Sequence, residues 1–93
     1  MDNEGFKQVE YSIPESPGVY RYFDKNEALL YVGKAKNLRK RVSQYFLEQR
    51  SPHRIRLMVR LIHRIEFTVV DTEHDALLLE NVLIKKLQPR YNI

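Results

Sequence analysis

One glutamate of this sequence lies where a free carboxylate is costly. The residues three and four positions away from Glu80 are all apolar, and on a helix this spacing places the carboxylate within an apolar face. These neighbours are Ala76, Leu77, Leu83 and Ile84. A carboxylate in such a place is protonated, paired with a base or bound to a metal. From the spacing alone we expect an ion pair with an arginine of the first helix rather than a metal, because pairing is the usual solution.

An arginine and three tyrosines form a second set of residues suited to chemistry. Arg41 lies three residues after Leu38 and four before Tyr45, on the apolar edge of a predicted helix. There its guanidinium can bind a carboxylate or a phosphate through two hydrogen bonds, or it can simply lie along its own helix. Tyr20, Tyr31 and Tyr45 converge if this helix folds over the preceding hairpin. Clustered tyrosines are most often core residues, and a Tyr hydroxyl acts as a general base only with help from a neighbouring base or metal.

Several other kinds of site are excluded. Loop 33–37 carries two lysines but lacks the spaced glycines and the final Ser or Thr of a P-loop, so it can hold one phosphate at most. The three histidines show no metal-ligand spacing, and the absence of cysteine excludes disulfides, thiolate metal sites and Cys nucleophiles. No apolar run could span a bilayer, and residues 1–7 do not resemble a signal peptide. We therefore expect a cytoplasmic protein with no membrane partner.

Positive charge is concentrated in the middle of the chain. Residues 34–64 contain ten Lys or Arg and one acid, whereas the remaining residues hold six bases and eleven acids, which leaves a net charge of +4. A basic block between acidic flanks favours a surface for nucleic acid, although a solvated basic face or an acidic protein partner is the alternative. The candidate DNA contacts are Lys36, Arg39 and Lys40, and we expect the last two to point to water.

A hairpin should carry two of the tyrosines. Residues 18–23 and 29–33 are rich in strand-forming side chains and flank a polar turn at 24–27. In antiparallel register this turn places Phe23 opposite Ala28 and Tyr20 opposite Tyr31, on one face of the sheet.

The remaining elements are mostly helical. Asn37 is a suitable N-cap for the helix that carries Arg41, and a second helix begins near residues 51–52. Residues 65–70 form a third strand, and Thr72 caps a last helix over residues 73–87. The order ββααβα predicts an α+β fold, a small three-stranded antiparallel sheet flanked by helices. We expect one domain over residues 1–93, with residues 1–11 as a flexible lead-in.

Three sequence motifs resemble those of a known family. Gly18-Val19-Tyr20 and Tyr31-Val32-Gly33 resemble the paired motifs of the GIY-YIG nucleases, with valine in place of isoleucine. Residues 31–46, which include the Gly-Lys-Ala-Lys loop, are similar to the UvrC type of this family. The same is true of residues 80–86 and of the ending at 89–92, so the resemblance covers residues 14–93.

The resemblance implies catalytic roles for five residues of the central region. Tyr31 would be the general base for the attacking water, with Tyr20 beside it. Lys34 would lie close to Tyr31 and favour its deprotonated form. Arg41 would stabilise charge on the scissile phosphate, and Tyr45 would help to orient that phosphate.

The resemblance also implies a metal and a closing residue. Glu80 would be the sole protein ligand of one divalent cation, Mg²⁺ or Mn²⁺, with waters completing the shell, which reverses the preference for an ion pair. Asn92 would close the site from the far end of the chain.

The implied activity is the 3′-side single-strand incision of damaged DNA in nucleotide excision repair. In the family a separate domain makes the 5′ cut, and further parts bind DNA and the partner UvrB. We therefore expect a fragment of a longer protein. The alternatives are a stand-alone GIY-YIG endonuclease and a non-catalytic DNA-binding module on the same scaffold.

Overall fold

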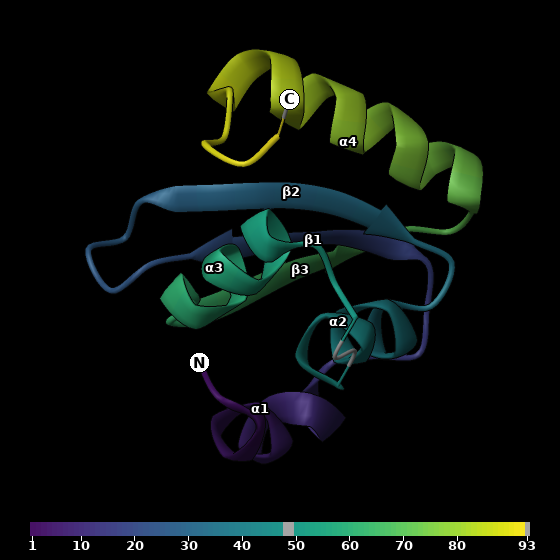
Figure 1. Ribbon diagram of the computed structural model, residues 1–93. Helices are drawn as coiled ribbons and strands as arrows, with labels where there is room; N and C mark the ends of the chain where they lie inside the picture. The colour runs from purple at the N-terminus through teal and green to yellow at the C-terminus, as the bar shows by residue number, and fades with distance from the viewer. Residues whose placement is uncertain (48–49, 93) are drawn as a thin grey trace.

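The computed structural model describes residues 1–47 and 50–92, which are built on a three-stranded antiparallel sheet of order β2-β1-β3 (Figure 1). The strands are β1 (Gly18–Phe23), β2 (Leu29–Ala35) and β3 (Arg64–Val69). The helices are α1 (Asn3–Val9), α2 (Leu38–Leu47), α3 (His53–Leu61) and α4 (Glu73–Leu87), and a 3-10 turn, η1 (Glu10–Ser12), follows α1. The predicted α+β class is confirmed, as is the order ββααβα from β1 onward.

The helices cover the two faces of the sheet unequally. Helix α4 lies on one side of the sheet, and α1, α2 and α3 lie on the other (Figure 1). Towards α4 the sheet buries Val19 and Val32, which pack with Ala76. The opposite face carries the larger core, in which the tyrosines of the sheet pack with residues such as Leu38 and Met58. Because side chains alternate along a strand, this second face is the one that presents Tyr20, Tyr22 and Tyr31.

The predicted register of the hairpin is wrong by two residues. Tyr22, rather than Tyr20, lies opposite Tyr31, and Tyr20 lies opposite Gly33. A shift of one residue would have moved every side chain to the other face, whereas a shift of two preserves the face. Tyr20 and Tyr31 therefore still point to the same side of the sheet, as expected, but as diagonal neighbours.

Two local features of the turn produce this shift. The Asp24 carboxylate accepts hydrogen bonds from the backbone N–H groups of Asn26 and Ala28 at 2.8 and 2.9 Å, which draws Ala28 into the turn. Leu29, one residue later than predicted, thus becomes the partner of Phe23. The register then shifts once more between Phe23 and the preceding residue of β1, as in a β-bulge. Both features depend on details of the loop that the alternation of residue types does not reveal.

Residues 1–11 do not form the expected lead-in. The Asp2 side chain accepts a hydrogen bond from the Gly5 N–H at 2.8 Å and so caps α1. Phe6 is fully buried and stacks on Phe46 of α2, with ring centroids 4.5 Å apart. An acidic N-cap residue, Asp2, followed four residues later by the aromatic Phe6 was the sequence signal for this helix. The segment is held against the domain because Phe6 is part of the core.

The predicted ends of the later helices are confirmed. The side chains of Asn37 and Thr72 accept hydrogen bonds from the backbone N–H groups of Lys40 and Asp75, at 3.0 and 3.1 Å. Helix α4 spans the predicted residues 73–87 and stops where Gln88 adopts a left-handed conformation with φ of 43°. None of the helices in the described part of the chain is long and apolar enough to cross a membrane.

Candidate active site at the edge of the sheet

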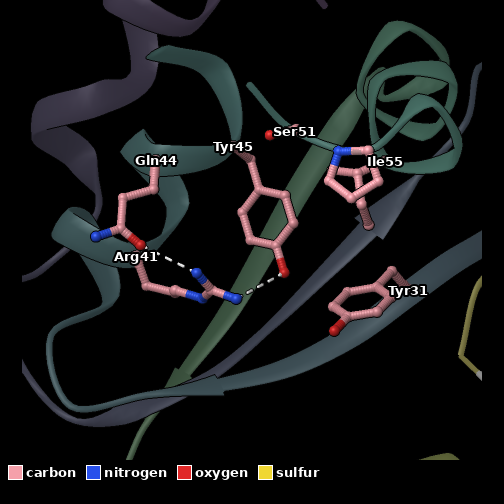
Figure 2. A pocket seen from close by; sticks show the side chains of 7 residues that line it. Tyr31, Arg41, Gln44, Tyr45, Ser51 and Ile55 are labelled. Carbon is pink, nitrogen blue, oxygen red and sulfur yellow. Dashed lines mark hydrogen bonds between the residues drawn. The ribbon is translucent and has the colours of Figure 1, made fainter. Parts of the chain in front are cut away.

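An open pocket lies between the edge strand β2, helix α2 and the start of α3 (Figure 2). Its volume is about 450 Å³. The lining residues are Tyr31, Arg41, Gln44, Tyr45, Ser51, Pro52 and Ile55. Of the residues singled out in the sequence, Tyr31, Arg41 and Tyr45 are thus brought together in one hollow. Such a hollow, with a few convergent polar groups, has the general character of a binding site.

Beneath the pocket the tyrosine rings form a compact cluster. The hydroxyls of Tyr20 and Tyr45 are 2.8 Å apart and share a hydrogen bond, and the ring of Tyr31 lies 6.1 Å from that of Tyr45. Tyr20 is buried, whereas Tyr31 is only half-buried at the pocket. Gly33 makes this packing possible, since a Cβ at that position would collide with the Tyr20 ring and hydroxyl. Tyr20, Tyr31 and Tyr45 therefore converge, as predicted.

Tyr22 is a fourth member of the cluster that our reading of the sequence missed. Its ring is buried 5.2 Å from that of Tyr45, and no partner for its hydroxyl is found among the described residues. The signal was available, because Tyr22 follows Tyr20 by two residues on a strand and must share its face.

Burial makes these tyrosines weak acids. It raises the pKa of Tyr20 to about 12. Burial is also the largest cause of the raised pKa of Tyr31, to which the neighbouring Tyr45 and the negative charge of Glu80 add, while Arg41 opposes the rise. Tyr31 is consequently a neutral phenol at pH 7, and it needs additional positive charge nearby to become a proton acceptor.

Arg41 is held by its own helix and not by a carboxylate. Its Nη1 donates to Gln44 Oε1 at 3.0 Å, its Nη2 approaches the Tyr45 hydroxyl at 3.5 Å, and its Cζ lies 4.9 Å from the Tyr45 ring centroid (Figure 2). The ion pair with Glu80 that spacing alone favoured is not formed between these described residues. The other expectation, that Arg41 lies along its own helix, agrees with these contacts, and the guanidinium also lines the pocket.

Glu80 is the carboxylate near Tyr31 that could hold a metal ion. It is half-buried on α4, close enough to Tyr31 for its charge to act on that hydroxyl. Within residues 1–47 and 50–92 it has no hydrogen bond or ion pair, and no cluster of three or more metal-ligating side chains occurs there. The apolar face around it is only partly covered, since Leu77 is 38% exposed. A lone carboxylate open to water suits a hard cation that keeps most of its hydration shell, such as Mg²⁺.

Asn92 reaches the site through the backbone of β2. Its amide Nδ2 donates to the Val32 carbonyl and its Oδ1 accepts from the Val32 N–H, both at 2.9 Å. The Tyr91 N–H donates to the Leu30 carbonyl at 2.8 Å. These bonds flank Tyr31 on both sides, so the end of the chain fastens the strand at the residue that faces the pocket. Both the oxygen and the nitrogen of the Asn92 amide are thus engaged by the backbone of Val32.

The cationic residues near the site occupy different places from those expected. Arg39 does not point to water: its Nε donates to the Ile13 carbonyl at 2.8 Å, and its guanidinium lies over the Tyr11 ring at 5.1 Å. Lys34 is exposed on the opposite face of the sheet from Tyr31, because the two residues are three apart on one strand, and it lines a hollow with α4. Among the groups that act most strongly on the pKa of the Tyr31 hydroxyl, the cation is Arg41.

Two of the predicted DNA contacts remain at the surface. Lys40 is exposed on α2. Lys36 is also exposed and lies 3.4 Å from the Glu73 carboxylate, in a solvated ion pair of little energetic consequence.

The fold and this site have counterparts among known proteins. A family model described as the UvrC-like GIY-YIG domain matches residues 16–93. The chain belongs to this family. The UvrABC system protein C of Porphyromonas gingivalis is 56% identical over 82 residues, and that of Christiangramia forsetii is 61% identical over 82 residues. In both cases the match covers 88% of this chain and 14% of the relative, so this UvrC-like domain spans about one seventh of their length.

A solved structure carries the same fold. The GIY-YIG N-terminal endonuclease domain of UvrC from Thermotoga maritima, bound to its catalytic divalent cation magnesium, superimposes with a TM-score of 0.84 at 33% identity. The match covers 100% of both chains, so it includes α1 as well as the sheet. The resemblance drawn from the three motifs is thereby confirmed.

Proposed function

We propose that this UvrC-like domain is a divalent-metal-dependent endodeoxyribonuclease that makes the single-strand incision on the 3′ side of damaged DNA in nucleotide excision repair. The observation that carries the proposal is the arrangement of Glu80, Tyr31 and Arg41. The Glu80 carboxylate, which forms no ion pair within the described residues, lies near the half-buried Tyr31 hydroxyl. Tyr31 and the Arg41 guanidinium line the same open pocket. Hydrolysis of a phosphodiester needs a cation site, a proton acceptor and a group that stabilises phosphate charge.

Each residue of the site has a distinct task in this proposal. Tyr31 accepts the proton of the attacking water, and Tyr20 and Tyr45 hold the hydroxyl network beneath it through their 2.8 Å contact. Arg41 binds the scissile phosphate, since it is cationic and has no carboxylate partner within the described residues. Asn92 is a positioning residue that acts on Tyr31 through the backbone of β2.

Glu80 is the residue that would hold the cation. A divalent cation bound there supplies positive charge that stabilises both the phosphate oxygens and the phenolate of Tyr31. The negative charge of Glu80 is itself one reason why the Tyr31 pKa is raised, so the carboxylate and the hydroxyl are electrostatically coupled in this chain. The magnesium bound to the Thermotoga maritima domain is consistent with this assignment, and Mn²⁺ is the natural substitute in an assay.

The wider role follows from the relatives and is also a proposal. We propose that Lys36 and Lys40 contact the DNA backbone, and that Arg39 does not, because it is engaged with Tyr11 and Ile13. The chain is proposed to be one nuclease domain of a longer protein, because its relatives are about seven times longer than the matched part. The partners are then DNA and, through other parts of that protein, UvrB, and the compartment is the cytoplasm.

The proposal is tested by the variant Glu80→Gln, which keeps the shape of the side chain and removes its charge. Binding of Mn²⁺, followed by calorimetry, should weaken strongly. Mn²⁺-dependent nicking of supercoiled DNA should fall by at least about 100-fold, since even the loss of a residue that only hydrogen-bonds to a metal ligand costs ~10–100-fold. The control is Glu73→Gln, which removes an exposed carboxylate of the same helix. Unchanged Mn²⁺ affinity in Glu80→Gln would refute Glu80 as the metal ligand.

A further inference from the structure

One neighbour that contacts the Arg41 guanidinium, Gln44, has no role in the proposed mechanism. Of the hydrogen bonds that its guanidinium makes within the described residues, the one to Gln44 Oε1, at 3.0 Å, is the shorter. The other, to the Tyr45 hydroxyl at 3.5 Å, is at the limit of a hydrogen bond, and that hydroxyl already shares a 2.8 Å bond with Tyr20. Gln44 is thus the principal polar restraint on the guanidinium.

We propose that Gln44 is a positioning residue for the incision reaction, holding the Arg41 guanidinium over the pocket in the orientation in which it receives the scissile phosphate. The inference rests on the proposed role of Arg41. Gln44 lies three residues after Arg41 on α2, the spacing at which helix side chains meet, and its carbonyl oxygen points at the guanidinium while its amide nitrogen points away (Figure 2). It lines the pocket beside Arg41 and Tyr45.

The chemistry of a glutamine suits this task better than that of a glutamate. A free arginine side chain samples many rotamers, and ordering it costs conformational entropy. A neutral amide oxygen restrains the guanidinium but leaves its full positive charge for an incoming phosphate. A carboxylate in the same place would restrain it equally and would compete with the phosphate for that charge. Arg41 is therefore ordered before DNA binds, without being neutralised.

Two substitutions separate orientation from charge. Gln44→Met keeps the length and helix propensity of the side chain but removes the acceptor. Gln44→Glu keeps an acceptor and adds a negative charge. Gln8, which is exposed on α1, provides the matched control Gln8→Met. Gln44 is itself exposed, so none of these changes disturbs the core.

The first measurement is the mobility of the Arg41 side chain, read from nitrogen relaxation of its Nε–H group in the protein without DNA. Mobility should rise in Gln44→Met and stay at the wild-type level in Gln44→Glu and in Gln8→Met. This readout does not require activity. If the wild-type chain fails to nick DNA, the proposed function of the isolated chain fails, while the mobility of Arg41 still decides the role of Gln44.

The second measurement is Mn²⁺-dependent nicking of supercoiled DNA. Gln44→Met should lower kcat by roughly 5–20-fold with KM changed by less than about twofold, as expected when an interaction that matters in the transition state is weakened. Gln44→Glu should lower kcat and raise KM, because its charge repels the phosphate. An Arg41 that is equally ordered in Gln44→Met overturns the proposal, and so does a mobile Arg41 combined with an unchanged kcat.

Discussion

The substitution Asn92→Ala tests whether the end of the chain acts on the site through the backbone. It removes two hydrogen bonds to Val32, each 2.9 Å long and partly buried. A hydrogen bond of this kind contributes about 1 kcal/mol net, so the loss is about 2 kcal/mol of unfolding free energy. Because β2 is an edge strand, water can replace part of what is lost, and the expected range is about 1–3 kcal/mol. For a domain of this size, 2 kcal/mol lowers Tm by roughly 8–16 °C.

Two assays measure this effect at different scales. Urea unfolding should show a lower midpoint with an unchanged slope, because the surface exposed on unfolding is the same. Hydrogen exchange should accelerate at the Val32 amide, whose acceptor is the Asn92 side chain. The control is Asn81→Ala, at an exposed position of α4, which should change neither. Incision by Asn92→Ala should fall together with these changes, since Tyr31 loses its support on one side.

One combination of results would refute this reasoning. If Asn92→Ala keeps wild-type stability and wild-type exchange at Val32 but loses incision, Asn92 acts directly on DNA or on the reacting groups. The variant Asn92→Asp sharpens the test, because it keeps an acceptor for the Val32 N–H but sets a carboxylate oxygen against the Val32 carbonyl. We expect it to be at least as destabilising as Asn92→Ala at neutral pH.

Two further predictions concern the tyrosine cluster. Tyr31→Phe should keep the fold and lower incision by roughly 10²–10⁴-fold. Burial holds the pKa of Tyr31 above the neutral range, so the small fraction of phenolate grows as pH rises through that range. The wild-type rate should therefore rise with pH, and this rise should be absent from Tyr31→Phe. A pH-dependent rate in the variant would point to another base. The second prediction concerns the free energy of unfolding. Burial raises the pKa of Tyr20 to about 12 and those of Tyr22 and Tyr45 above the ordinary 10.0. The contribution of these neutral phenols to the free energy of unfolding is therefore fully present below about pH 10 and is lost as pH rises towards 12. Urea unfolding at several alkaline pH values measures this loss, and a midpoint that stays constant to pH 12 would contradict it.

Local sequence determined the order of the strands and helices from β1 onward, and where two of the helices begin. Asn37 and Thr72 cap helices where their side chains predict caps, and the last helix runs over the predicted residues 73–87. Capping and periodicity depend on neighbours within four residues, so they can be read from a short window. The identity of the family was also contained in the sequence, because the residues of its motifs keep a fixed order and spacing along the chain.

Tertiary structure alone decided which of those residues meet. Glu80 was expected on spacing to pair with an arginine of the first helix, yet the two residues come from α4 and α2. The packing of these helices instead brings the charge of Glu80 within electrostatic reach of the Tyr31 hydroxyl. The resemblance implied that Lys34 lies close to Tyr31, but side chains three residues apart on one strand point to opposite faces, so Lys34 lies on the face that α4 covers.

The same distinction explains the remaining errors. The register of the hairpin depended on the Asp24 turn and on a register shift, and the place of α1 depended on Phe6 finding Phe46 across the core. These contacts join residues whose distance along the chain says nothing of their distance in space. Sequence determined which residues are available for the chemistry and which helix or strand carries each of them. Only the packing of those elements, which buries the apolar faces together, decided which charges and hydroxyls face one another at the pocket.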